Sequence, residues 1–165
     1  MKKILLLVGL AVFLAVAAVL LALPLLKGEE TDAEDRQAYL LRGDAYFSEG
    51  KLAEAIIEWR NAAKIDTSYG PTYFRLGKAY MRLDDPLKGI VELQRSLRFD
   101  PQLYEAQMLI GSWLWRSGIY DEALLKSELV IQQDSTHVEA HLLASLVLAE
   151  QEEYLDAFNA VHQDL

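Results

Sequence analysis

Hydrophobic residues form one uninterrupted stretch at the start of the chain. Ile4 to Leu26 contains no charged side chain and is preceded by Lys2-Lys3. A helix rises about 1.5 Å per residue, so this stretch is long enough to cross a bilayer core of roughly 30 Å. We therefore predict a transmembrane anchor within residues 1–27, followed by an acidic linker and the start of the first domain helix at 28–35.

A cleaved secretory signal is the alternative for this segment, because Ala15-Val16-Ala17 has the small-x-small pattern of a cleavage site. Cleavage there would leave the apolar run AVLLALPLL at the new N-terminus, which favours the uncleaved anchor. The span is preceded by lysines and followed by the mostly acidic KGEETDAED. Basic flanks favour the cytoplasmic side, so we expect a cytoplasmic N-terminus and an extracytoplasmic, periplasmic domain.

Beyond the linker, the hydrophobic pattern repeats at a fixed interval. Gly43, Gly77 and Gly111 are evenly spaced, and Ser145 follows at the same distance. Three more columns keep the register: Tyr46, Tyr80, Leu114 and Leu148; Ala55, Gly89, Ala123 and Ala157; and Asp66-Thr67, Asp100-Pro101 and Asp134-Ser135. A fixed period in the range of about 20–50 residues is typical of stacked supersecondary units, each too small to bury its own apolar face.

Each period divides into two predicted helices. Gly50 and Gly118 stand between the paired helices, where a left-handed residue is useful, and Pro71 and Pro86 suit a first helical turn. Apolar residues of the second helices follow helical spacing: Leu52, Ile56, Trp59 and Ala63 in one unit, and Leu87, Val91 and Leu97 in the next. We predict that the small residues mark the closest helix contacts, and that Tyr46, Tyr80 and Trp59 belong to the core.

These columns resemble the tetratricopeptide repeat (TPR), in which each unit of about 34 residues is an antiparallel helix pair. The resemblance implies an all-α TPR superhelix with units at 36–69, 70–103, 104–137 and an incomplete 138–165. Its structural signature residues would be Gly43, Tyr46, Ala55, Gly77, Tyr80, Gly89, Pro101, Gly111, Ala123 and Ala157. In the incomplete unit we expect a second helix with Leu155, Phe158, Val161 and Leu165 on one uncovered stripe.

The resemblance also implies a protein-binding groove lined by the first helix of each pair. Carried over by position, its residues would be Leu40, Phe47, Phe74, Lys78, Met81, Arg82, Met108, Trp115 and Arg116. This surface is apolar with a local basic element of Lys78, Arg82 and Arg116, which predicts an apolar partner segment carrying an acidic group. Members of the family that grip a C-terminal carboxylate use a Lys and Asn set, whereas Leu40 and Asp44 stand at the corresponding places of the first unit. A clamp of that kind is therefore not expected.

Candidate chemistry is sparse in the sequence. There is no cysteine, no glycine-rich phosphate loop and no nucleophile elbow. His137 and His141 are four residues apart, as in some zinc sites, but His137 falls at a turn where Thr136 and Glu139 have capping-box spacing. We expect no catalytic residue, cofactor or metal; a metal-dependent enzyme using His137 and His141 is the alternative from another functional class.

The charge distribution excludes one class of partner. All 25 acidic residues follow Gly28, together with 13 of the 16 basic ones, so residues 28–165 carry a net charge of 13 − 25 = −12. Nucleic acid would be repelled by this domain. We predict a membrane-anchored scaffold for protein–protein interactions in envelope assembly, secretion or export, with self-association through the incomplete fourth unit. A cleaved, soluble periplasmic adaptor is the alternative.

Overall fold

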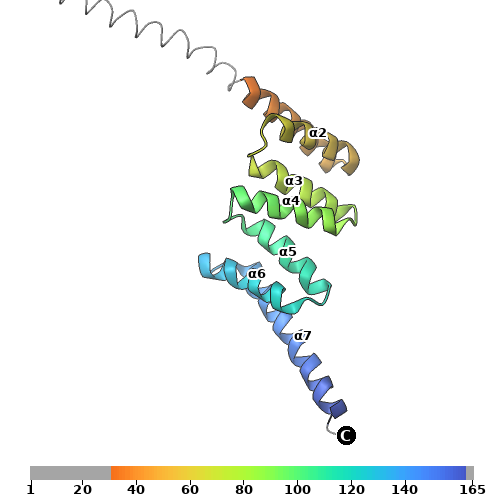
Figure 1. Cartoon of the computed structure of the whole chain (residues 1–165), viewed down its shortest axis with the longest axis vertical. Helices are drawn as coiled ribbons and strands as arrows, with labels where there is room; N and C mark the ends of the chain where they lie inside the picture. Colours follow the sequence, from red (N-terminus) through yellow and green to blue (C-terminus); the bar gives the residue numbers. More distant parts are fainter. Residues whose placement is uncertain (1–30, 163–165) are drawn as a thin grey trace, which may run out of the picture.

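The computed structural model describes residues 31–162, with side chains described through residue 153, as seven helices and no strand. A first helix at residues 31–48 is followed by α2 (Leu52–Ile65), α3 (Gly70–Arg82), α4 (Pro86–Phe99), α5 (Tyr104–Arg116), α6 (Tyr120–Gln133) and α7 (Val138–His162). Successive antiparallel pairs stack one after another into an elongated array (Figure 1). The predicted all-α repeat architecture is confirmed.

The predicted anchor within residues 1–27 lies outside the described residues. Within residues 31–162, no helix combines the length and the apolar composition needed to cross a bilayer.

A left-handed residue closes the turn inside each of the first three helix pairs. Gly50, Asp84 and Gly118 have φ angles of 77°, 59° and 75°, and each stands at the same position of its unit. The same backbone hydrogen bond accompanies each of them, from an amide five residues on to the carbonyl of Tyr46, Tyr80 or Leu114, at 2.9–3.0 Å. This pattern ends one helix and returns the chain antiparallel to it.

The fourth unit differs from the prediction. Residue 152 occupies the position of Gly50, Asp84 and Gly118, but it is a glutamate within α7, which continues without a break to His162. Gln151, Glu152 and Glu153 are good helix formers, and none of them is a residue that adopts the left-handed conformation readily. The predicted second helix of this unit is therefore wrong, and the unit consists of one long helix. The side chains of Ala157 and of the predicted stripe from Leu155 onward lie outside the described side chains.

The glycines of the first helices mark close helix contacts, as predicted. A Cβ on Gly43 would lie 2.3 Å from Nε1 of Trp59, and one on Gly77 would lie 2.6 Å from Cγ of Leu93. A Cβ on Gly111 would lie 2.9 Å from Leu143. These positions are therefore glycine because the second helix of the pair, or the next unit, lies too close for a side chain. The stabilisation from this close packing exceeds the roughly 1 kcal/mol of helix propensity that glycine loses relative to alanine.

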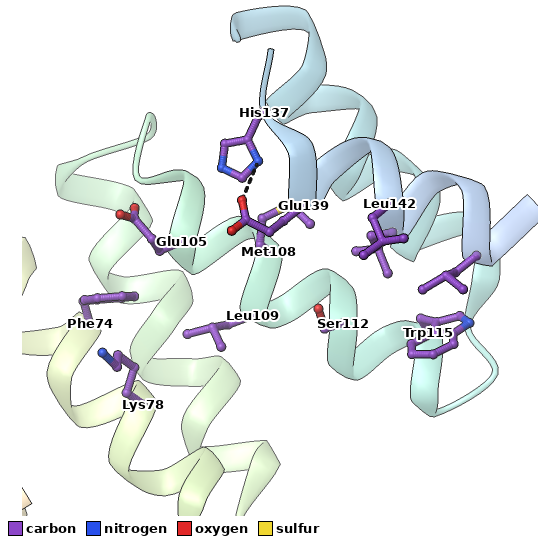
Figure 2. Close-up of a pocket in the computed structure, with 12 residues that line it drawn as sticks. Phe74, Lys78, Glu105, Met108, Leu109, Ser112, Trp115, His137, Glu139 and Leu142 are labelled. Atoms are coloured by element: carbon purple, nitrogen blue, oxygen red, sulfur yellow. Dashed lines mark ion pairs between the residues drawn. The ribbon is translucent and has the colours of Figure 1, made fainter. Parts of the chain in front are cut away.

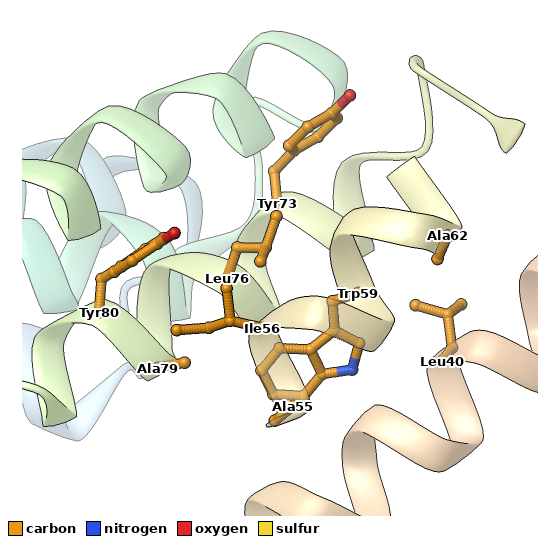
Figure 3. Close-up of a cluster of buried hydrophobic side chains, with 9 residues drawn as sticks. All are labelled: Leu40, Ala55, Ile56, Trp59, Ala62, Tyr73, Leu76, Ala79 and Tyr80. Atoms are coloured by element: carbon orange, nitrogen blue, oxygen red, sulfur yellow. The ribbon is translucent and has the colours of Figure 1, made fainter. Parts of the chain in front are cut away.

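The core follows the repeat columns. Ala55 and Ala123 are fully buried, and Gly89 takes the same column in the middle unit. Trp59 and Tyr80 are buried as predicted, in a cluster with Leu76 and Tyr73 (Figure 3). Tyr46 is partly buried and packs against this cluster. Leu87 and Val91 are exposed instead, and Leu93 is the buried leucine of α4.

Aspartates hold the turns between units. Asp66 accepts hydrogen bonds from the amide and hydroxyl of Ser68 at 2.9 and 2.7 Å, and Asp134 accepts the same pair from Thr136. Asp100 accepts one from the amide of Gln102. Arg36 also binds Asp66 at 2.6 Å, which ties this turn to the first helix. The aspartate column therefore caps α2, α4 and α6, and Pro101 follows one of its members in the turn.

Replacing Gly43 by alanine is expected to lower the free energy of unfolding by up to about 2 kcal/mol. The added methyl group overpacks against Trp59, which costs about 1–3 kcal/mol, and the gain in helix propensity offsets only about 1 kcal/mol of that. Urea unfolding of Gly43→Ala, Trp59→Leu and the double variant measures the coupling. In the Trp59→Leu background, Gly43→Ala should leave the free energy of unfolding unchanged or raise it. An equal decrease in both backgrounds would contradict the close contact between Gly43 and Trp59.

Acid should weaken the turn at Asp66. The hydrogen bonds from Ser68, with Arg36, hold the pKa of Asp66 below its ordinary value of 3.8. The unfolded carboxyl titrates near this ordinary value, so the contribution is complete above it and is lost as pH falls through the lower folded pKa. Asp66→Asn should cost about 1 kcal/mol at pH 7, and this cost should shrink as acid protonates the folded carboxyl. Unfolding of Asp35→Asn, an exposed carboxylate on the first helix, is the control and should show no such convergence.

Candidate functional site

The first helices of successive pairs line a concave groove. Its larger pocket has a volume of about 470 Å³ and is built by α3, α5 and α7 (Figure 2). Apolar side chains form most of the wall: Phe74, Met108, Leu109, Trp115, Leu142, Leu143 and Leu146. The other lining residues are polar: Lys78, Ser112, Glu105, His137 and Glu139.

A second pocket continues the groove toward the first helix. It has a volume of about 290 Å³ and is lined by Asp44, Phe47, Trp59, Phe74, Arg75 and Lys78. Phe74 and Lys78 line both pockets, so the two hollows share one wall on α3. The groove therefore runs from the first helix to α7 along the same face of the array.

Lys78 is the cation that lines both pockets of this groove. Its Nζ lies 5.3 Å from the ring centroid of Phe74 and 5.7 Å from that of Phe47. Arg82 stands one turn further on α3, with its guanidinium 4.7 Å from the Phe47 ring. Within the described part of the chain, neither cation forms an ion pair. Aromatic faces attract these charges weakly, so both remain available to an anionic group of a ligand.

Asp44 does not neutralise Lys78, although it lines the same pocket. Its two carboxylate oxygens accept hydrogen bonds from Nε and Nη2 of Arg75 at 2.8 and 3.2 Å. Arg75 also donates to the carbonyl of Pro71. This two-point pairing occupies the carboxylate that lines the second pocket together with Lys78, because a planar guanidinium matches both oxygens at once.

One edge of the larger pocket is acidic (Figure 2). Glu105 and Glu139 occupy the same repeat position in successive units, in the first turns of α5 and α7. Nδ1 of His137 accepts a hydrogen bond from the amide of Ala140 at 3.3 Å and lies 3.4 Å from the Glu139 carboxylate. His137 therefore caps α7, whereas Thr136 binds Asp134; the expected Thr136 capping box is wrong because its hydroxyl is already engaged.

Sequence reasoning placed five groove residues where the pockets contain them: Phe47, Phe74, Lys78, Met108 and Trp115. Leu40 is a correction, because it is 1% exposed and lies beside Trp59 and Ala62 in the core (Figure 3). Met81 is another, since it fills the space over Gly89, whose Cβ would lie 3.0 Å from its Cγ. Arg82 stands at the rim, and Arg116 is exposed but lines neither of the two pockets.

Four pocket residues were not predicted from the sequence: Leu109, Leu143, Glu105 and Glu139. Leu109 and Leu143 occupy one repeat column, and Glu105 and Glu139 occupy another, so an alignment of every column would have matched each pair. The repeat columns do not show whether a carboxylate in a first helical turn faces the groove. Such carboxylates also occur at helix starts because they stabilise the first turn.

Metal chemistry finds no support at His137 and His141. Nε2 of His141 lies 2.9 Å from the carbonyl of Ser135, and Nδ1 of His137 accepts the capping hydrogen bond. Across the described residues, no three His, Cys, Asp or Glu side chains gather as metal ligands would.

Two known repeat families match segments of this chain. A family described as "TPR repeat" matches residues 43–84, and one described as "Tetratricopeptide repeat" matches residues 70–103. Tetratricopeptide repeats are therefore present in this chain, and the helices on both sides of the matched segments continue the same fold.

One sequence relative and several solved structures are similar to this chain. Residues of this chain are 28% identical to the BBSome complex member BBS4 of Bos taurus over 92 positions, 56% of this chain and 18% of that protein, so the match spans less than a fifth of the relative. The first TPR of Spaghetti (RPAP3) bound to the HSP90 peptide SRMEEVD superimposes with a TM-score of 0.67 at 18% identity, over 72% of this chain and 94% of that one. Pseudomonas aeruginosa pilF gives 0.64 at 22% identity, over 74% and 56%.

Proposed function

We propose that this chain is a scaffold whose groove binds an extended segment of a partner protein. The observation that carries the proposal is the groove of two adjoining pockets, of which the larger is mostly apolar, with Lys78 shared by both and in no ion pair among the described residues. Apolar hollows with a few convergent polar groups are typical of binding sites. The TPR of Spaghetti, which shares the fold, is bound to a peptide.

The polar groups give the bound segment a direction. Lys78 and Arg82 would receive an acidic side chain near α3, and the apolar residues that follow would fill the pocket between Phe74 and Trp115. Glu105 and Glu139, along the edge of the pocket where α5 and α7 begin, would accept hydrogen bonds from a donor or a basic side chain. A segment that combines an acidic group, apolar residues and a donor matches these charges.

A terminal carboxylate is not required by this arrangement. Leu40 is buried and Asp44 is paired with Arg75, so neither position offers the free donor that a carboxylate clamp needs. The acidic group can therefore belong to a side chain within a longer segment.

We further propose that residues 1–27 anchor the scaffold in the membrane, with the repeat domain on the extracytoplasmic side. The support is the uncharged run from Ile4 to Leu26 and the basic residues before it. Recruitment of envelope assembly, secretion or export proteins would follow from that location. A cleaved, soluble periplasmic adaptor remains the alternative function.

Selection from a random peptide library should identify groove ligands with an acidic residue beside apolar ones. The full chain in detergent is the bait. Trp115→Ala should weaken the best peptide at least tenfold, because truncating a buried aromatic anchor costs more than about 1.4 kcal/mol. Lys78→Glu should shift the selected peptides from acidic to basic.

Arg116→Ala is the matched control for these variants, since Arg116 neighbours Trp115 but lines neither pocket. It should leave affinity within twofold. Peptides that bind the Trp115→Ala and Lys78→Glu variants as tightly as the unchanged chain would overturn the groove as the binding site.

Membrane fractionation should separate the anchor from the cleaved signal. We expect the chain to stay in the pellet after alkaline carbonate extraction and to begin at Met1 or Lys2, because a spanning helix resists extraction. External protease should cleave the repeat domain in spheroplasts. A carbonate-soluble chain beginning after Ala17 would show the soluble adaptor instead.

A further inference from the structure

Arg75 differs in residue type from the rest of its repeat column. The same position of the other units holds Leu41, Leu109 and Leu143, and the last two of these line the larger pocket. At Arg75 the column instead places a cation in the wall of the second pocket. A leucine would fit the repeat, so the packing of the units does not explain why this side chain is charged.

Asp44 and Lys78 also share a repeat column, on the first helix and on α3. Nζ of Lys78 lies 5.7 Å from the ring centroid of Phe47, which stands one turn from Asp44 on the first helix. Arg75 stands one turn before Lys78 on α3, on the same face of that helix. Two cations on adjacent turns of α3 therefore compete for the carboxylate of Asp44 within one pocket.

Geometry favours Arg75 in this competition. Its Nε and Nη2 donate to the two carboxylate oxygens of Asp44 at 2.8 and 3.2 Å, and its Nη1 donates to the carbonyl of Pro71 at 3.1 Å. The bond to Pro71 holds the guanidinium in the orientation that matches both oxygens. Lys78 offers one nitrogen on a flexible stem, and within the described part of the chain it forms no ion pair.

We infer that Arg75 is a positioning residue that holds Asp44 away from Lys78 and so determines the charge that the second pocket presents to a ligand. This inference rests on the proposed binding groove. With Arg75 in place, two cations outnumber one carboxylate in the pocket, and the ammonium of Lys78 is available. Without Arg75, Asp44 would pair with Lys78, and the pocket would carry no net charge. Arg75 therefore sets the preference for an acidic group by engaging Asp44, and Lys78 is the residue that binds the acidic group.

Acetylation of amines in the full chain, in detergent, tests this role without any ligand. Arg75→Leu gives the position the residue type of its column and should slow the acetylation of Lys78 by about two- to fivefold, as expected for a partly exposed ion pair. A neighbouring carboxylate slows the reaction because it favours the protonated, unreactive amine. Mass spectrometry measures the rate relative to Lys64, an exposed lysine on α2. Adding Asp44→Asn to Arg75→Leu should restore the rate.

Arg42→Leu is the matched control for Arg75→Leu. Arg42 also joins two helices, through the Glu58 carboxylate at 2.8 Å, but it lines neither pocket of the groove. Its loss should leave the acetylation of Lys78 unchanged. An unchanged rate in Arg75→Leu, or a slow rate that persists after Asp44→Asn is added, would overturn the assignment.

Peptide binding tests the consequence for the groove. The probe is the best acidic peptide selected with the unchanged chain, compared with the same peptide carrying the amide in place of its acidic residue. Arg75→Leu should reduce the preference for the acidic form by about twofold or more, and adding Asp44→Asn should restore it. A preference that survives in Arg75→Leu would contradict the inference. A library that yields no peptide would count against the proposed groove alone, because the acetylation of Lys78 needs no ligand.

Discussion

The left-handed turn residue is the constraint on which the rest of this structure depends. Where Gly50, Asp84 and Gly118 adopt positive φ, the chain reverses, and the second helix lies against the first closely enough for Gly43 or Gly77 to be required. Reversal at a fixed interval also keeps every first helix on the same side of the array. The groove is therefore a consequence of turn chemistry repeated once in each unit, and its walls need no special scaffold.

The same constraint explains the end of the described array. At residue 152 a glutamate continues the helix, so α7 has the packing surface of a first helix but no second helix folds back over it. Aliphatic residues that would be core in any other unit are left on the surface, at a cost of roughly 25 cal/mol per Å² of apolar area. Asp84 shows that glycine is not obligatory at this position, because aspartate tolerates the left-handed region better than most residues. Glutamate lacks the short side chain that makes this possible.

The repeat columns made the fold predictable, since size and polarity at a few positions decide where helices touch. They predicted the paired helices, the close glycines and the buried Trp59 and Tyr80. Predictions from a single column were wrong where its residue packs against a different residue type in another column. Met81 shares a column with the pocket residues Phe47 and Trp115, but Gly89 opposite leaves a space that Met81 fills. Leu40 is buried although Phe74, in its column, lines the pockets, because Leu40 packs with Trp59 and Ala62 in the first pair. Such exchanges between neighbours depend on three-dimensional packing, and a single column does not contain them.

The groove offers two kinds of contact to a ligand, the charge of Lys78 and the apolar side chains of the larger pocket. The domain is strongly acidic, so its long-range field disfavours the approach of an acidic segment, and that field is screened within about 8 Å at physiological salt. Lys78 acts within that range, because Asp44 is held by Arg75 and Lys78 forms no ion pair among the described residues. In the proposed function, affinity comes mainly from apolar burial between Phe74 and Trp115. Lys78 and Arg82 set the register of the bound segment, so its binding should vary little with salt but strongly with the position of the acidic residue.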